Sequence, residues 1–272
     1  MRITRLLPAL AGAAALTLLA MPAQADTSDT AMLSVLHGVP DTTVDVYVDG
    51  ELTLDDFEPG DLAGPLELPA GTYSVAITAA DAEDDSEPVI GPVDLPLEGG
   101  MNYTAVAFLD EAGAPTAALF TNDTSDIAAG EGRLTVRHVA AAPAVDVLAG
   151  GDAVITDLAN GDEQSLDLPA GTVSASVAAA GTTDPVIGPA DVAVAEGQLT
   201  IAYAWGSLEG DSLMLATQTV TGMDSAPDGV PTGQVEVRTG MDAGTWVAMV
   251  AAVLGIALLV LVARSRREAG ER

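Results

Sequence analysis

The stretch "LPAGT" occurs at Leu68–Thr72 and again at Leu168–Thr172, and it predicts the end of one strand and the start of the next. Proline fixes φ and has no N–H to donate to a sheet, so the first strand ends at Pro69. The next two residues reverse the chain, and the β-branched Thr72 favours a new strand. The residue order differs from the Leu-Pro-x-Thr-Gly of wall-sorting signals. Two copies about a hundred residues apart predict a duplicated domain.

Longer segments repeat in the same order around these pentapeptides. "LSVLHGVPDTTVDVYVDG" at 33–50 matches "LTVRHVAAAPAVDVLAGG" at 134–151, and "NYTAVAF" at 102–108 aligns with "QLTIAYA" at 198–204. Apolar and polar residues alternate within them, and Asp49-Gly50 is typical of a hairpin turn. The sequence therefore predicts an all-β chain of two tandem antiparallel β-sandwiches, Ig-like or prealbumin-like, with about seven strands each.

Composition shifts divide the chain into six expected segments. They are a signal peptide at 1–25, a first sandwich at 26–123, a second sandwich at 131–220, a Gly-, Pro- and Asp-rich stalk at 221–244, a transmembrane helix at 245–263 and a basic tail at 264–272. Since each repeat is complete, we expect fragments of about 30–123 and 131–221 to unfold cooperatively on their own.

The N-terminal segment has the pattern of a secretory signal. Arg2 and Arg5 precede an apolar run, and Ala23-Gln24-Ala25 gives small residues at the two positions that signal peptidase reads. Cleavage is therefore expected between Ala25 and Asp26. An uncleaved N-terminal anchor is the alternative.

The C-terminal segment has the pattern of a membrane anchor. Trp246 to Ala263 contains no charge and as a helix would span about 27 Å, close to the thickness of a bilayer core. Arginines follow at once, as the positive-inside rule requires of a cytoplasmic end. We expect a single-pass cell-membrane protein with extracellular N-terminal domains and a cytoplasmic tail. Cell-wall sorting is disfavoured because "VPTGQ" at 230–234 lacks the required pattern.

The chain is strongly acidic, with 40 Asp and Glu, nine arginines, no lysine and no cysteine. Without cysteine no disulfide can hold the outer domains. Such a surface repels nucleic acid and anionic lipid headgroups, and it favours cations and a basic envelope or extracellular partner. The oxygen-rich segments "LDDFEPGD" at 54–61 and "DAEDDSE" at 81–87 lack the spacing of known calcium loops and are interpreted as solvated tips. A calcium- or carbohydrate-binding module remains an alternative.

The two histidines occupy equivalent positions in the repeats. His37 is followed eight residues later by Asp45, and His138 by Asp146. A His–Asp pair belongs to catalytic triads, but no cysteine and no Gly-x-Ser-x-Gly elbow accompanies it, and a zinc site needs more ligands than one His per repeat. We predict that each imidazole has a structural role and holds a loop by hydrogen bonds. The Asp eight residues later is a candidate acceptor for such a bond. No catalytic, cofactor or metal site is predicted; an extracellular hydrolase is the second alternative.

The segments "VLHGVPDTTVDVYVDG" and "LPAGTYSVAI" resemble the DUF4397 family, a bacterial extracellular β domain of unknown function. The resemblance extends over about 32–121 and 133–220, and the second copy departs from it where Tyr47 becomes Leu148. It implies the sandwich fold and no catalytic residue. We therefore expect a non-enzymatic, membrane-anchored surface protein that presents two β-sandwich modules for binding, adhesion or envelope organisation.

Overall fold

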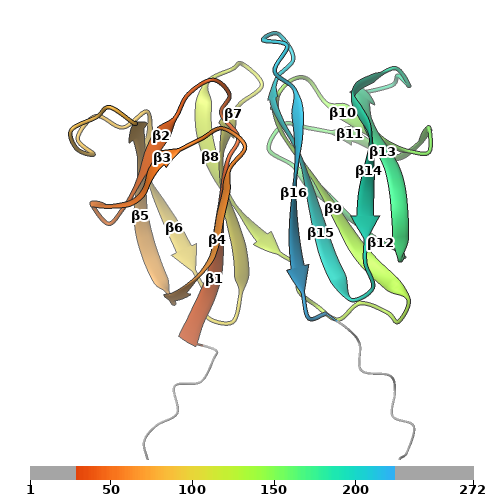
Figure 1. Cartoon of the computed structure of the whole chain (residues 1–272), viewed down its shortest axis with the longest axis horizontal. Coiled ribbons are helices and arrows are strands. Elements are labelled where there is room, and N and C mark those ends of the chain that lie inside the picture. The colour runs from red at the N-terminus through yellow and green to blue at the C-terminus, as the bar shows by residue number, and fades with distance from the viewer. Residues whose placement is uncertain (1–28, 224–272) are drawn as a thin grey trace, which may run out of the picture. The chain divides into compact units, whose positions relative to one another are not determined.

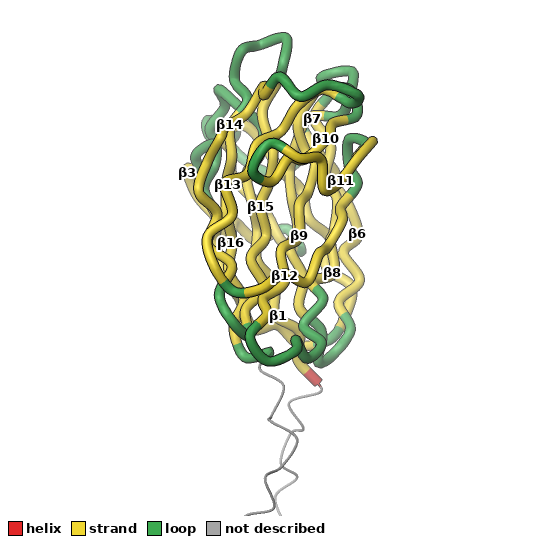
Figure 2. The backbone as a smooth tube through the Cα atoms, turned by 90° about the vertical axis from the view of Figure 1, so that its right-hand side faces the viewer, coloured by secondary structure: helices red, strands yellow, loops and turns green. Residues whose placement is uncertain are grey.

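The computed structural model describes residues 29–223, which form sixteen strands in four four-stranded sheets within one compact unit (Figure 1). The strands of the first half are β1 (Thr30–His37), β2 (Val44–Val48), β3 (Glu51–Phe57), β4 (Leu62–Pro69), β5 (Gly71–Ala79), β6 (Ile90–Leu97), β7 (Asn102–Leu109) and β8 (Pro115–Asn122). Those of the second half are β9 (Glu131–Ala141), β10 (Val145–Ala149), β11 (Asp152–Leu158), β12 (Glu163–Pro169), β13 (Gly171–Ala179), β14 (Pro185–Val194), β15 (Gln198–Ser207) and β16 (Met214–Thr221). Short loops join the strands (Figure 2).

Each half is a β-sandwich of two sheets with the same strand order. The first pairs β4-β1-β7-β8 with β3-β2-β5-β6, and the second pairs β12-β9-β15-β16 with β11-β10-β13-β14. The all-β prediction is confirmed, but each sandwich has eight strands rather than about seven. The prediction of antiparallel sheets is also wrong in part, because β1 runs parallel to β7 and β9 runs parallel to β15. Alternation along a strand shows which face is buried and carries no information on the direction of its neighbours.

The "LPAGT" segments end and begin strands as predicted. β4 ends at Pro69 and β5 begins at Gly71, and the second copy repeats this at Pro169 and Gly171. The two strands lie in different sheets, so the pentapeptide carries the chain from one layer of the sandwich to the other. The hairpin between β2 and β3 turns at Asp49-Gly50, where both residues have positive φ of 52° and 81°. This is the two-residue turn that suits the twist of a hairpin.

The strand registers correct the alignment of the repeats by one residue. His37 lies beside Ala107 in the first sandwich and His138 lies beside Ala204 in the second, so 102–108 corresponds to 199–205. The alignment with 198–204 is wrong because a slip of one residue would exchange the two faces of the strand. With the corrected register, Ala107 and Ala204 both pack into the core of their own sandwich.

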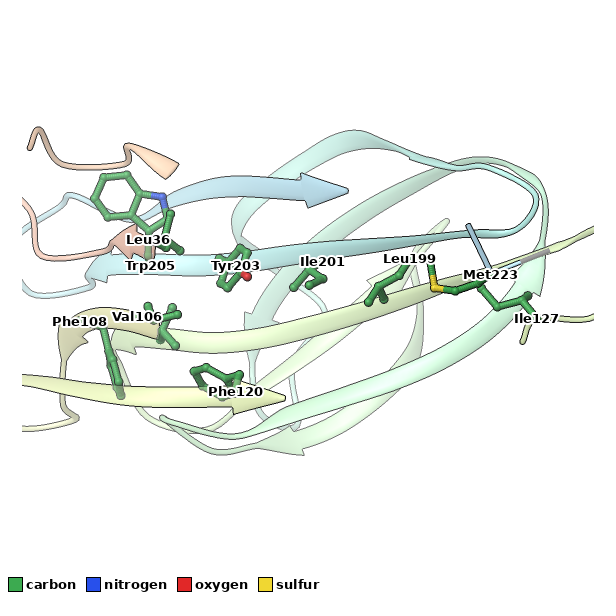
Figure 3. Packing of buried hydrophobic residues seen from close by; sticks show 11 residues of the cluster. Leu36, Val106, Phe108, Phe120, Ile127, Leu199, Ile201, Tyr203, Trp205 and Met223 are labelled. Carbon is green, nitrogen blue, oxygen red and sulfur yellow. The ribbon is translucent and has the colours of Figure 1, made fainter. Parts of the chain in front are cut away.

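A third apolar cluster joins the two sandwiches (Figure 3). It contains buried side chains from both halves: Leu36, Val106, Phe108, Phe120, Ile127, Val139, Leu199, Ile201, Tyr203, Trp205 and Met223. Strands β9 and β15 are consequently buried on both faces. One face of each strand packs in the core of the second sandwich, and the opposite face packs in this shared cluster. The contact lies between the sheet of β1 and β7 and the sheet of β9 and β15.

Candidate functional site

His37 holds the loop between β1 and β2. Its ring is only 1% exposed, and its Nε2 lies 2.7 Å from the carbonyl oxygen of Thr42. Its Nδ1 is 3.4 Å from the backbone nitrogen of Val39. A backbone N–H only donates, so Nδ1 accepts this bond and the Nε2–H donates to Thr42. The ring also stacks on Phe57, with 5.8 Å between ring centroids. The imidazole therefore ties its strand end to the following loop.

His138 makes the corresponding bond in the second sandwich. Its Nε2 lies 3.1 Å from the carbonyl oxygen of Pro143, and its ring is equally buried. Burial lowers the pKa of both His37 and His138 below the ordinary value of 6.5. Removal from water disfavours the charged imidazolium, so both rings are neutral at about pH 7. A neutral ring has one N–H, and in each sandwich that N–H is engaged by a carbonyl.

Asp45 and Asp146 bind backbone N–H groups at β-bulges and do not bind the histidine rings. Asp45 Oδ1 accepts the N–H of Asp56 and Asp146 Oδ1 accepts the N–H of Asp157, each at 2.9 Å. Both donors have positive φ, where the register of the hairpin shifts. The expectation that this Asp accepts from the ring of His37 or its counterpart is wrong within the described residues. The His belongs to one sheet, whereas the Asp projects from the outer face of the other sheet.

A buried arginine that sequence reasoning did not single out lies between the sandwiches. Arg137 is fully buried, and its Nε donates to Glu163 at 2.7 Å. Its two terminal nitrogens donate to the Tyr203 hydroxyl at 2.8 Å and to the Asn122 side-chain carbonyl at 2.7 Å. The guanidinium also lies 4.4 Å from the centroid of the Phe120 ring. Asn122 and Phe120 come from the first sandwich, so Arg137 connects the two halves chemically.

The first sandwich encloses an apolar cavity of about 270 Å³ between its two sheets. Aliphatic side chains from both sheets line it, among them Leu33, Val46, Leu54, Leu66, Val75 and Ala117. Interiors pack to the density of organic crystals, and voids larger than a water are few. This void has roughly twice the volume of an engineered apolar cavity of about 150 Å³ that binds benzene. It is large enough for an apolar group of about ten heavy atoms.

The cavity opens between the edge strands β3 and β4, which do not pair with each other. Leu66 pairs across the ladder with the core residue Leu33 and so faces the interior, yet it is 37% exposed. At this mouth Asp49, Glu51 and Thr53 are exposed, whereas Tyr73, the other polar residue of the lining, is half-buried. An apolar group could enter here while its polar end stays near acidic side chains.

The second sandwich has a smaller counterpart of about 180 Å³ at the equivalent place. One cause is a size difference on the last strand. The registers place Leu215 of β16 at the position of Ala117 in β8, and Leu215 packs against the second core. At the edge strand, Leu166 is half-buried where Leu66 is exposed. The two copies therefore differ in the volume available to a ligand.

The two acidic segments lie on the first sandwich. Segment 54–61 supplies Asp55 and Asp56, whose carboxylates lie close to that of Asp45. Segment 81–87 forms part of the loop between β5 and β6, where most of its side chains are exposed.

The predictions for the two ends of the chain lie outside the described residues. These are the signal peptide with its cleavage site between Ala25 and Asp26, most of the stalk, and the helix from 245 to 263 with its tail. Within residues 29–223, no helix is long and apolar enough to cross a membrane.

Residues 31–148 match the family described as Domain of unknown function (DUF4397). Over this stretch the match confirms the resemblance seen in the sequence. The matched stretch runs from the start of the first sandwich into β10 of the second. The existence of two copies rests instead on the repeated segments and on the identical strand order of the two sandwiches. Curated proteins give no match to this chain.

Proposed function

We propose that this chain is a non-enzymatic binding protein of the cell surface, in which the first sandwich binds a small apolar group. The observation that carries the proposal is the solvent-open aliphatic cavity of the first sandwich. Binding sites for small molecules are concave and mostly apolar, with a few polar groups that orient the ligand. The cavity fits this description, with aliphatic walls and three exposed polar residues at its mouth.

The charge of the mouth limits the chemistry of the ligand. Asp49 and Glu51 are exposed there, and Asp85 lies near Gly50 of the adjoining turn. A carboxylate at the polar end of a ligand would be repelled at these distances, whereas an alcohol, amide or ammonium would not. We therefore propose an uncharged or cationic amphiphile, such as a medium-length alkyl chain with a hydroxyl end.

The proposed location rests on the two ends of the sequence. A signal-like segment at 1–25 and an uncharged run at 245–263 followed by arginines support export and a single C-terminal membrane anchor. Adhesion or envelope organisation through a basic partner is the corresponding role for the acidic outer surface. The finer fold assignment, Ig-like or prealbumin-like, is part of the same proposal, and the eight-stranded two-sheet order supports it.

Hydrolysis is less well supported than binding. Each histidine N–H is engaged by a carbonyl, and the nearby signature aspartates bind backbone amides on a different sheet. A triad needs base and carboxylate in contact. We therefore propose no catalytic role for His37, Asp45, His138 or Asp146.

The binding proposal is tested with decanol and the purified full chain. We expect decanol to raise the melting temperature saturably, since a ligand that binds only the folded state stabilises it. Ala117→Leu, which introduces the residue of the second copy, should fill the cavity and remove most of this effect. Decanoate should raise the melting temperature less than decanol does.

The control is Leu52→Ala, which removes an exposed apolar side chain of β3 outside the cavity. Its response to decanol should equal that of the wild type. An identical response from the Ala117→Leu variant, or no response from the wild type, would rule out the cavity as the binding site.

A further inference from the structure

Three carboxylates converge on the outer face of the first sandwich. One oxygen from each of Asp45, Asp55 and Asp56 lies within 4.8 Å of the others. The register between β2 and β3 shifts beside Asp45, and Asp56 has a positive φ of 52°. This irregularity allows two consecutive aspartates to approach the same partner residue. Three like charges at this separation repel one another, and a cation would offset that repulsion.

A buried hydroxyl lies beside this group. Thr78 of β5 stands directly opposite Asp45 in the ladder, so both side chains occupy the same face about 4.5–5.5 Å apart at Cβ. Thr78 is fully buried, and its Oγ1 has no hydrogen-bond partner among the described residues. Few buried polar groups lack a partner in folded proteins, and an ion is one explanation for those that do.

The second sandwich satisfies its equivalent aspartate with protein groups. Asp146 accepts the N–H of Asp157 at 2.9 Å and, through its other oxygen, the N–H of Gly181 at 2.8 Å. Asp45, within the described part of the chain, accepts only the N–H of Asp56. The first copy thus leaves one carboxylate oxygen available where the second does not.

The other two groups also differ between the copies. The registers place Thr156 where the first sandwich has Asp55, and Ala178 where it has Thr78. The first change replaces a carboxylate by a hydroxyl, and the second removes a hydroxyl. The second copy keeps carboxylates at the positions of Asp45 and Asp56, as Asp146 and Asp157. The third carboxylate, the unpartnered hydroxyl and the available oxygen occur together in the first sandwich and are absent together from the equivalent place in residues 145–181.

We propose that Asp45, Asp55, Asp56 and Thr78 bind a divalent cation of the calcium class. All of these ligands are oxygens, the type that Ca²⁺ prefers, and its flexible coordination of six to eight ligands lets water complete an incomplete protein shell. Mg²⁺ requires stricter octahedral geometry, so we expect it to bind such a site more weakly than Ca²⁺ does. The site faces outward from the sheet whose inner face lines the apolar cavity, so either site can exist without the other.

The test measures the melting temperature of the full chain against CaCl₂ at constant ionic strength. We expect a saturable rise with a Kd on the order of 10⁻⁴–10⁻³ M, as in extracellular calcium modules. Asp55→Thr, which introduces the residue of the second copy, should weaken Ca²⁺ binding at least tenfold. Thr78→Val, which keeps the shape and removes the hydroxyl, should weaken it several-fold. MgCl₂ should produce a smaller rise.

Asp191→Thr is the matched control, since it removes an exposed carboxylate from the second sandwich. It should retain the wild-type Kd, which separates site binding from general attraction to an acidic chain. The proposal is overturned if the wild type shows no saturable rise, or if Asp55→Thr and Asp191→Thr have the same Kd. A chain that does not bind decanol is still expected to bind Ca²⁺. The cavity proposal and the cation proposal can therefore be rejected independently of each other.

Discussion

At the residue scale, each histidine ring closes the loop that follows its strand through one hydrogen bond to a carbonyl five residues later. We expect His37→Ala to destabilise the chain by about 1–3 kcal/mol, because the mutation leaves the carbonyl of Thr42 and the N–H of Val39 without their partner. Denaturant unfolding of the wild type and the variant gives the difference. An unchanged midpoint together with lost decanol binding would instead make His37 a ligand-binding residue.

The two buried rings also predict how stability depends on pH. Burial lowers the pKa of His37 and His138, so between 6.5 and the lowered values the unfolded chain binds more protons than the folded one. Their contribution is therefore fully present above about pH 6.5 and is lost as the pH falls through that window.

The denaturant midpoint of the wild type should therefore decrease from about pH 7.5 to about pH 5.5. Carboxylates titrate mainly below this range. A variant with both His37→Gln and His138→Gln should show a smaller decrease, and an equal decrease would assign the pH dependence to other groups.

Arg137 is the residue whose loss should cost most at the contact between the sandwiches. Arg137→Met should destabilise the chain by about 2–4 kcal/mol, because Asn122, Tyr203 and Glu163 lose their partner while two of them stay buried. Arg133→Met is the comparison, since the carboxylates that Arg133 binds, Asp123 and Asp167, are 57% and 40% exposed against 33% for Glu163. It should cost less than Arg137→Met, because its exposed carboxylate partners can bind water once the arginine is gone. Similar losses in both variants would show that burial of Arg137 is not what stabilises the contact.

At the scale of elements, strand ends and inward faces could be predicted from sequence, but layer-to-layer contacts could not. Pro69 and Gly71 delimit strands by backbone chemistry that depends on no other part of the chain. The parallel pairing of β1 with β7, by contrast, depends on a chain reversal far away in sequence. The double burial of β9 could not be predicted either, because Arg133, Thr135 and Arg137 alternate with apolar residues there as on a strand with one solvated face. A cavity depends on side-chain sizes from several strands together, and no local pattern reports it.

Burial of a strand on both faces predicts that it undergoes local unfolding least often. Amide hydrogen exchange should be slowest in β9 and β15, which are covered on both faces, and faster in the edge strands β3 and β4 beside the cavity mouth. Peptide-resolved exchange measured by mass spectrometry gives this comparison. Equal protection of β4 and β9 would mean that the shared cluster adds nothing to local stability.

At the scale of the molecule, the shared cluster changes the expectation for the two halves. Fragments of about 30–123 and 131–221 would each expose one side of that cluster, and the second would contain Arg137 without Asn122. We now expect both fragments to be less stable than the intact chain, and residues 29–223 to unfold in one calorimetric transition. Two resolved transitions, each reproduced by one fragment, would restore the interpretation of independent domains.

The proposed function requires that the first of the two similar sandwiches bind an apolar chain more tightly than the second, whose cavity is smaller. Photolabelling of the full chain with an alkyl alcohol that carries a diazirine, followed by peptide mapping, tests it most directly. We expect label at the cavity mouth, on peptides with Leu54 and Leu66, that decanol competes away and that Ala117→Leu abolishes. Equal labelling of the corresponding peptides with Ile155 and Leu166, or label spread over exposed surface, would contradict it.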